Sequence, residues 1–71
     1  MKTPAKPQKN RQLIQARKER GWTQREMAKV IGISSNSYLS RLEAGLIRPR
    51  VDTARRIALA LGKPVDEIFL H

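Results

Sequence analysis

The sequence predicts a small all-α domain of five short helices. Apolar residues recur at intervals of three and four, glycines stand at the ends of the segments that carry this pattern, and no segment alternates between apolar and polar residues as a strand does. The chain has 71 residues and no cysteine, so we expect one small core held by apolar packing alone, without a disulfide framework.

The first predicted helix spans residues 10–20. Asn10 suits its N-cap, and Gly21 supplies the left-handed conformation that ends it. The segment before it, residues 1–9, has two prolines and no large apolar residue after Met1, so we expect a flexible basic arm there. The arm carries Lys2, Lys6 and Lys9, and the inward face of the helix carries Leu13, Ala16 and Arg17.

The second and third predicted helices follow closely. Thr23 and Glu26 have the spacing of a capping box, so the second helix starts there and ends at Gly32. After a short polar turn, the third helix runs over residues 36–44 and is closed by Gly45. Their expected inward residues are Met27, Ala28 and Ile31 in the second helix and Leu39 and Leu42 in the third.

Two further helices complete a domain that covers residues 10–71. Asp52 and Thr53 place favourable groups in the first turn of the fourth helix, which ends at Gly62. Pro64 suits the first turn of a short fifth helix. Apolar residues fall at helical spacing at Val51, Ala54, Ile57, Ala58 and Leu61 in the fourth helix, and the fifth offers Val65, Ile68 and Phe69 to close the core.

The net charge of +9 is unevenly distributed. The first 50 residues hold twelve Lys and Arg against three Glu, whereas residues 51–71 balance three bases against three acids. This excess of positive charge in the first 50 residues favours binding to nucleic-acid phosphates or to an anionic membrane. The alternative is a basic surface that only contacts solvent.

Other function classes find little support. No apolar stretch approaches the roughly 20 residues of a membrane helix, so we expect a cytoplasmic, nucleoid-associated protein with no membrane partner. His71 is the only histidine, and the chain has no suitable carboxylate pair and no Gly-rich phosphate loop. We therefore expect no enzymatic activity, no metal site, no cofactor and no small-molecule ligand.

Two short helices separated by a Gly-containing turn match the helix-turn-helix motif. Further along the chain stand the segments Gly21-Trp22-Thr23-Gln24, Glu26-Met27-Ala28, Gly32-Ile33-Ser34, Tyr38-Leu39-Ser40-Arg41-Leu42-Glu43-Ala44-Gly45, Ile57-Ala58-Leu59-Ala60-Leu61-Gly62 and Asp66-Glu67-Ile68-Phe69, together with Pro49. With these segments, residues 11–69 resemble the Cro and phage-repressor family of helix-turn-helix proteins, also called the XRE family. The resemblance implies a compact five-helix lambda-repressor-like domain that binds double-stranded DNA sequence-specifically, with the third helix in the major groove.

The resemblance implies that Ser35, Asn36, Ser37 and Arg41 read bases. Arg41 is the sharpest candidate, because a guanidinium can bond both O6 and N7 of guanine, whereas a serine discriminates weakly. Asn36 has two interpretations, an amide matched to adenine or the N-cap of the helix.

The chain departs from the family pattern in the turn. Five residues separate Gly32 from Tyr38, where the family usually has four. The extra residue either lengthens the turn or starts the third helix earlier. The first reading positions are therefore assigned only to within one residue, whereas Arg41 lies downstream of the insertion.

The family's phosphate contacts map onto six residues. For Gln24 the alternative is an exposed polar side chain in a first turn, for Tyr38 it is packing at the helix edge, and for the two arginines it is solvated charge. The arm lysines either lie along the DNA or have no specific role. The expected phosphate contacts are Thr23, Gln24, Ser34, Tyr38, Arg48 and Arg50.

Two charged residues are expected to serve structure. The resemblance implies that Arg17 and Glu43 form an ion pair that joins the first helix to the end of the third. Trp22 is expected to cover the core, and base stacking on single strands is poorly supported.

We expect a transcriptional regulator, acting as a repressor in a prokaryote, phage or mobile element. A module this small usually needs a homodimer on two half-sites about 34 Å apart. Alternatives are an antitoxin or restriction-control protein of the same fold, a protein-interaction module that does not bind DNA, and a basic membrane binder. Self-association would use the fourth and fifth helices and the tail, around Val65, Ile68, Phe69 and Leu70.

Overall fold

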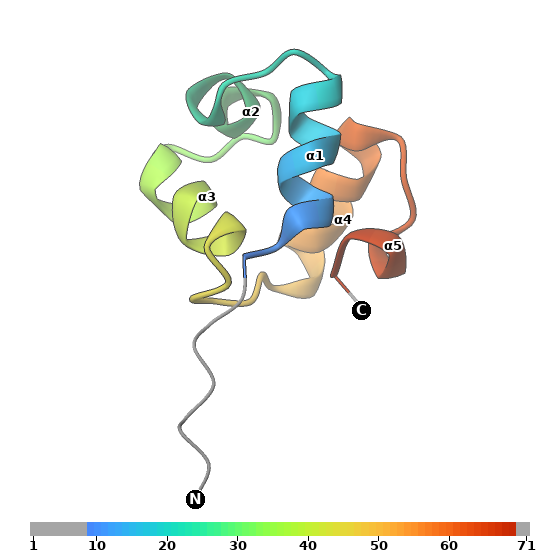
Figure 1. Ribbon diagram of the computed structural model, residues 1–71. Helices are drawn as coiled ribbons and strands as arrows, with labels where there is room; N and C mark the ends of the chain where they lie inside the picture. The colour runs from blue at the N-terminus through green and yellow to red at the C-terminus, as the bar shows by residue number, and fades with distance from the viewer. Residues whose placement is uncertain (1–8, 70–71) are drawn as a thin grey trace, which may run out of the picture.

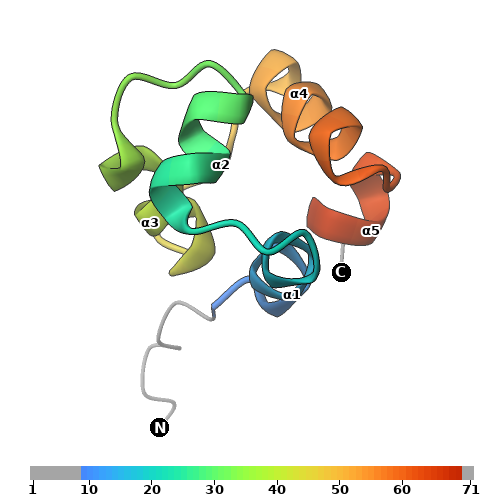
Figure 2. The same ribbon diagram turned by 90° about the horizontal axis from the view of Figure 1, so that it is seen from above.

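The structure is a computed structural model that describes residues 9–69. This part of the chain forms five α-helices and no strand, so the predicted all-α fold class is confirmed. In Figures 1 and 2, α2 and α3 lie on one side of the domain, α4 and α5 on the other, and α1 between them. The helices are α1 (Arg11–Glu19), α2 (Gln24–Val30), α3 (Asn36–Glu43), α4 (Val51–Leu61) and α5 (Val65–Phe69).

Side-chain caps determine where α1 and α2 begin. The Asn10 side chain accepts a hydrogen bond from the Leu13 N–H at 3.0 Å, as expected of an N-cap. The Thr23 hydroxyl accepts from the Glu26 N–H at 3.1 Å, and the Glu26 carboxylate accepts from the Thr23 N–H at 2.9 Å. The predicted capping box is therefore confirmed.

A side-chain cap determines where α3 begins. Ser35 is the N-cap: its backbone is extended and its hydroxyl accepts from the Ser37 N–H at 3.2 Å. Asn36 is already the first helical residue, so its interpretation as the N-cap is wrong. The helix therefore begins at the residue where the third predicted helix begins.

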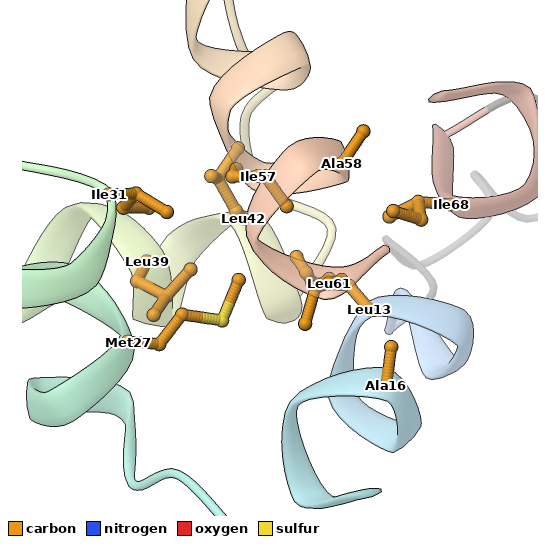
Figure 3. Close-up of a cluster of buried hydrophobic side chains, with 10 residues drawn as sticks. All are labelled: Leu13, Ala16, Met27, Ile31, Leu39, Leu42, Ile57, Ala58, Leu61 and Ile68. Atoms are coloured by element: carbon orange, nitrogen blue, oxygen red, sulfur yellow. The ribbon is translucent and has the colours of Figure 1, made fainter. Parts of the chain in front are cut away.

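The core lies between the five helices, and each helix contributes to it (Figure 3). Val51 is an exception among the expected apolar positions, since it is 68% exposed. As the first residue of α4 it precedes the buried positions and lies beyond the cluster. Trp22 is half-buried and packs against the cluster, as expected. The cluster comprises Leu13, Ala16, Met27, Ile31, Leu39, Leu42, Ile57, Ala58, Leu61 and Ile68.

Asn10 links three helices. Its backbone N–H donates to the Glu43 carbonyl at 2.8 Å, and its side-chain amide donates to the Ile68 carbonyl at 2.9 Å. These bonds tie the start of α1 to the end of α3 and to α5. The orientation of α3 is thus fixed by hydrogen bonds as well as by core packing. None of the helices described has the length and apolar character needed to cross a membrane.

Candidate nucleic-acid interface

The outer face of α3 is polar. Its inward residues Leu39 and Leu42 are buried, and the helix lies at the edge of the domain in both views of the ribbon (Figures 1 and 2). A helix with one side buried and the other polar and exposed can present side chains to an external partner. The exposed residues of α3 are Asn36, Ser37, Ser40 and Arg41.

Three of the four expected base-reading residues lie on this exposed face: Asn36, Ser37 and Arg41. Ser35 is also exposed, but its hydroxyl oxygen is occupied in capping the helix. Ser40 was missed by the sequence analysis. Its position, four residues after Asn36 and three after Ser37, places it on the same helical face, and this spacing could have identified it.

The start of α2 adjoins the end of α3. Thr23 and Glu26 are exposed, and the Thr23 hydroxyl and the Glu26 carboxylate each accept one capping hydrogen bond. The bond from the Thr23 backbone N–H, and secondarily its side chain, lowers the pKa of the Glu26 carboxyl. At neutral pH Glu26 is therefore a carboxylate, and it accepts the capping hydrogen bond from the Thr23 N–H.

The remaining expected phosphate contacts differ in environment. Ser34 is exposed in the turn before α3, and Arg48 and Arg50 are exposed in the connection to α4. Tyr38 is half-buried and its side chain packs against the core. Only the hydroxyl end of Tyr38 is therefore a candidate for an external contact.

The basic residues near α3 carry uncompensated charge. Within residues 9–69, Arg41, Arg48 and Arg50 form no ion pair. Lys9 is exposed directly before Asn10. The other two arm lysines, Lys2 and Lys6, lie outside the described residues.

Glu43, at the end of α3, is buried and accepts hydrogen bonds from two other segments. Arg17 Nε lies 2.6 Å from Glu43 Oε2, and Arg17 Nη2 lies 3.2 Å from Oε1, so the expected ion pair is present. Arg17 Nη1 also donates to the Trp22 carbonyl at 2.6 Å. Gln24 Nε2 donates to Glu43 Oε1 at 3.0 Å, a contact that the sequence analysis did not anticipate.

A hollow lies between α4, α5, the end of α3 and the connection from α3 to α4. Val65 and Phe69 line it, and so does the exposed Val51. Ile68, by contrast, is fully buried, so its expected role in self-association is wrong. Leu70 lies outside the described residues.

Comparisons with known proteins agree with this arrangement. A family model described as "Helix-turn-helix" matches residues 13–68. An uncharacterised HTH-type transcriptional regulator of Methanothermobacter thermautotrophicus is 40% identical over 55 residues, which cover 76% of this chain and 78% of the relative. The chain therefore belongs to the Cro and phage-repressor (XRE) type of helix-turn-helix family, a family of DNA-binding transcriptional regulators.

Proposed function

We propose that this protein binds double-stranded DNA sequence-specifically by inserting α3 into the major groove, and that it represses transcription in a prokaryote, phage or mobile element. The observation that carries the proposal is the exposed polar face of α3 beside unpaired arginines. The major groove is wide enough for a helix, and its base edges offer the acceptors and donors that such a face can bond. A regulator of this kind works at the nucleoid, in the cytoplasm.

The side chains on α3 divide by how well they discriminate bases. Arg41 is proposed to bond O6 and N7 of a guanine. Asn36 is proposed to bond N6 and N7 of an adenine, because it is exposed and free of the capping role. Ser37 and Ser40 would add weaker contacts, and Ser35 would contact DNA through its hydroxyl hydrogen or the second lone pair of its oxygen.

The phosphate contacts would supply affinity and register without sequence information. Arg48 and Arg50 are exposed and unpaired within the described residues, which suits this role. The proposed set comprises Thr23, Gln24, Ser34, Tyr38, Arg48 and Arg50, with the arm lysines Lys2, Lys6 and Lys9 as further contacts.

We also propose that two copies bind together as a homodimer. The hollow lined by Ile47, Val51, Val65 and Phe69 presents apolar side chains that a second copy would cover. It borders the connection that carries Arg48, so a dimer formed there would bring two phosphate-binding segments together. Sedimentation of the protein alone and with DNA tests this, and a monomer at every concentration on every duplex would rule it out.

The test of the main proposal is selection of bound duplexes from a random pool, followed by Arg41→Ala. We expect a defined motif and a loss of about 1–3 kcal/mol at one base position, with relaxed preference there. Arg56→Ala is the matched control, since Arg56 is an exposed arginine of α4. Recovery of no motif, or an equal loss in both variants on all sequences, would contradict the proposal.

A further inference from the structure

The carboxylate of Glu43 accepts three hydrogen bonds, two from Arg17 and one from Gln24. Arg17 bonds it through Nε and Nη2 and accounts for the ion pair between α1 and α3. Gln24, from the first residue of α2, bonds the same Oε1 at 3.0 Å. Glu43 is only 4% exposed, so these bonds form where water competes little.

The bond to Gln24 is not required to start α2. Thr23 and Glu26 already cap that helix through two reciprocal hydrogen bonds. Nor is it required to neutralise Glu43, whose charge is compensated by Arg17. Its remaining effect is on Gln24 itself, a half-buried side chain whose torsions would otherwise be free to rotate.

The bond fixes the orientation of the Gln24 amide by holding its nitrogen toward Glu43. A glutamine amide has two N–H donors on nitrogen and an acceptor oxygen, and either end can in principle face a neighbour. Glu43 accepts only, so it selects the orientation with nitrogen inward. The second N–H is then held at about 120° from the first by the planar geometry of the group. A phosphate also accepts only, so it requires this second N–H rather than the oxygen.

We propose that Glu43 is a positioning residue for DNA binding, which orients the Gln24 amide so that its second N–H donates to a backbone phosphate. The inference rests on the proposed function and adds a second role to a residue otherwise explained by the ion pair. It connects the end of the reading helix to a phosphate contact at the start of the preceding helix. The side chain that touches DNA is Gln24, and Glu43 acts through it.

The first test uses the free protein in solution. We expect the side-chain amide of Gln24 to be rigid on the nanosecond timescale by ¹⁵N relaxation and its protons to exchange slowly. Gln12, an exposed residue of α1 whose side chain makes no hydrogen bond within residues 9–69, is the matched control. A Gln24 amide as mobile as that of Gln12 would overturn the inference whether or not the protein binds DNA.

The second test replaces single phosphates of a bound duplex by neutral methylphosphonates. Replacement of the one phosphate that Gln24 contacts should weaken wild-type binding about tenfold, because the hydrogen bond from Gln24 is lost. The binding of Gln24→Ala should not change when that phosphate is replaced. Arg17→Met/Glu43→Met, which removes the acceptor without leaving a buried charge, should lose the same sensitivity and keep the others. Arg17→Lys, which perturbs the ion pair without removing the carboxylate from Gln24, should keep it. A uniform change at all phosphates in the double variant would reduce Glu43 to a structural residue and overturn the inference.

Gln24→Asn tests the same point without perturbing the ion pair. The asparagine amide is one methylene shorter and cannot span the distance to Glu43, so this variant should lose the phosphate-specific sensitivity as Gln24→Ala does. Full retention would overturn the positioning role. Absence of any DNA binding by the wild-type protein, in contrast, would refute the proposed function and leave the relaxation measurement to decide on the orientation of Gln24.

Discussion

Arg17→Met should destabilise the domain severely. The side chain of Arg17 is 11% exposed and makes two bonds to Glu43 and one to the Trp22 carbonyl. Methionine retains much of the apolar stem of arginine but none of its donors. Glu43, whose side chain is 5% exposed, would be left charged and buried with Gln24 as its remaining side-chain partner.

The magnitude follows from the burial of both groups. Removing one partner of a buried ion pair costs about 3–5 kcal/mol, because the other charge is left uncompensated. At roughly 0.05–0.15 kcal/mol per residue, a chain of this length has a free energy of unfolding of about 4–11 kcal/mol. The variant would therefore lose between about a quarter and all of the stability. For a domain of this size the Tm should fall by at least about 12 °C.

Thermal and urea unfolding followed by circular dichroism measure this loss. Lys18→Met is the matched control, because it removes a positive charge from an exposed neighbour on the same helix and should change the Tm little. The double variant Arg17→Met/Glu43→Met should recover a large part of the loss, since it removes the buried charge as well. A decrease below about 1 kcal/mol in Arg17→Met, the size of an exposed ion pair, would refute the reasoning.

Three further outcomes are expected. Gly62→Ala should lower the Tm, because Gly62 has φ +67° and an added Cβ would lie 2.9 Å from Arg20 Nη2; an unchanged Tm would contradict this. The lowered pKa of Glu26 means that its hydrogen bond to Thr23 stabilises the fold at neutral pH and ceases to do so as the pH falls through the folded pKa. The stability difference between wild type and Glu26→Gln, measured by urea unfolding, should accordingly shrink on acidification and would argue against the cap if it grew. Deletion of residues 1–9 should flatten the plot of log affinity against log salt by up to about three units, and an unchanged slope would exclude the arm from the phosphates.

The boundaries of the helices could be predicted because their signals are local. The Asn10 cap and the Thr23–Glu26 box each involve residues three apart, so sequence spacing alone identifies them. The exposure of Val51 could not be predicted in this way, because it depends on where the core ends. The bond between Gln24 and Glu43 joins residues 19 apart on different helices and depends on how α2 packs against α3.

The exposed face of α3 was predictable in spite of the extra residue before it. The residues that a helix buries determine which of its faces points outward. In α3 these residues are Leu39 and Leu42, which lie downstream of the turn. They fix the rotation of α3 wherever the additional residue is placed, and Ser35 caps the helix. Asn36, Ser37, Ser40 and Arg41 therefore face outward because of the leucines, not because of the turn. It follows that deletion of Ser34, which shortens the turn, should lower the free energy of unfolding more than it changes the base preference. Exchange of Leu39 for a polar residue should abolish both the stable fold and the base preference.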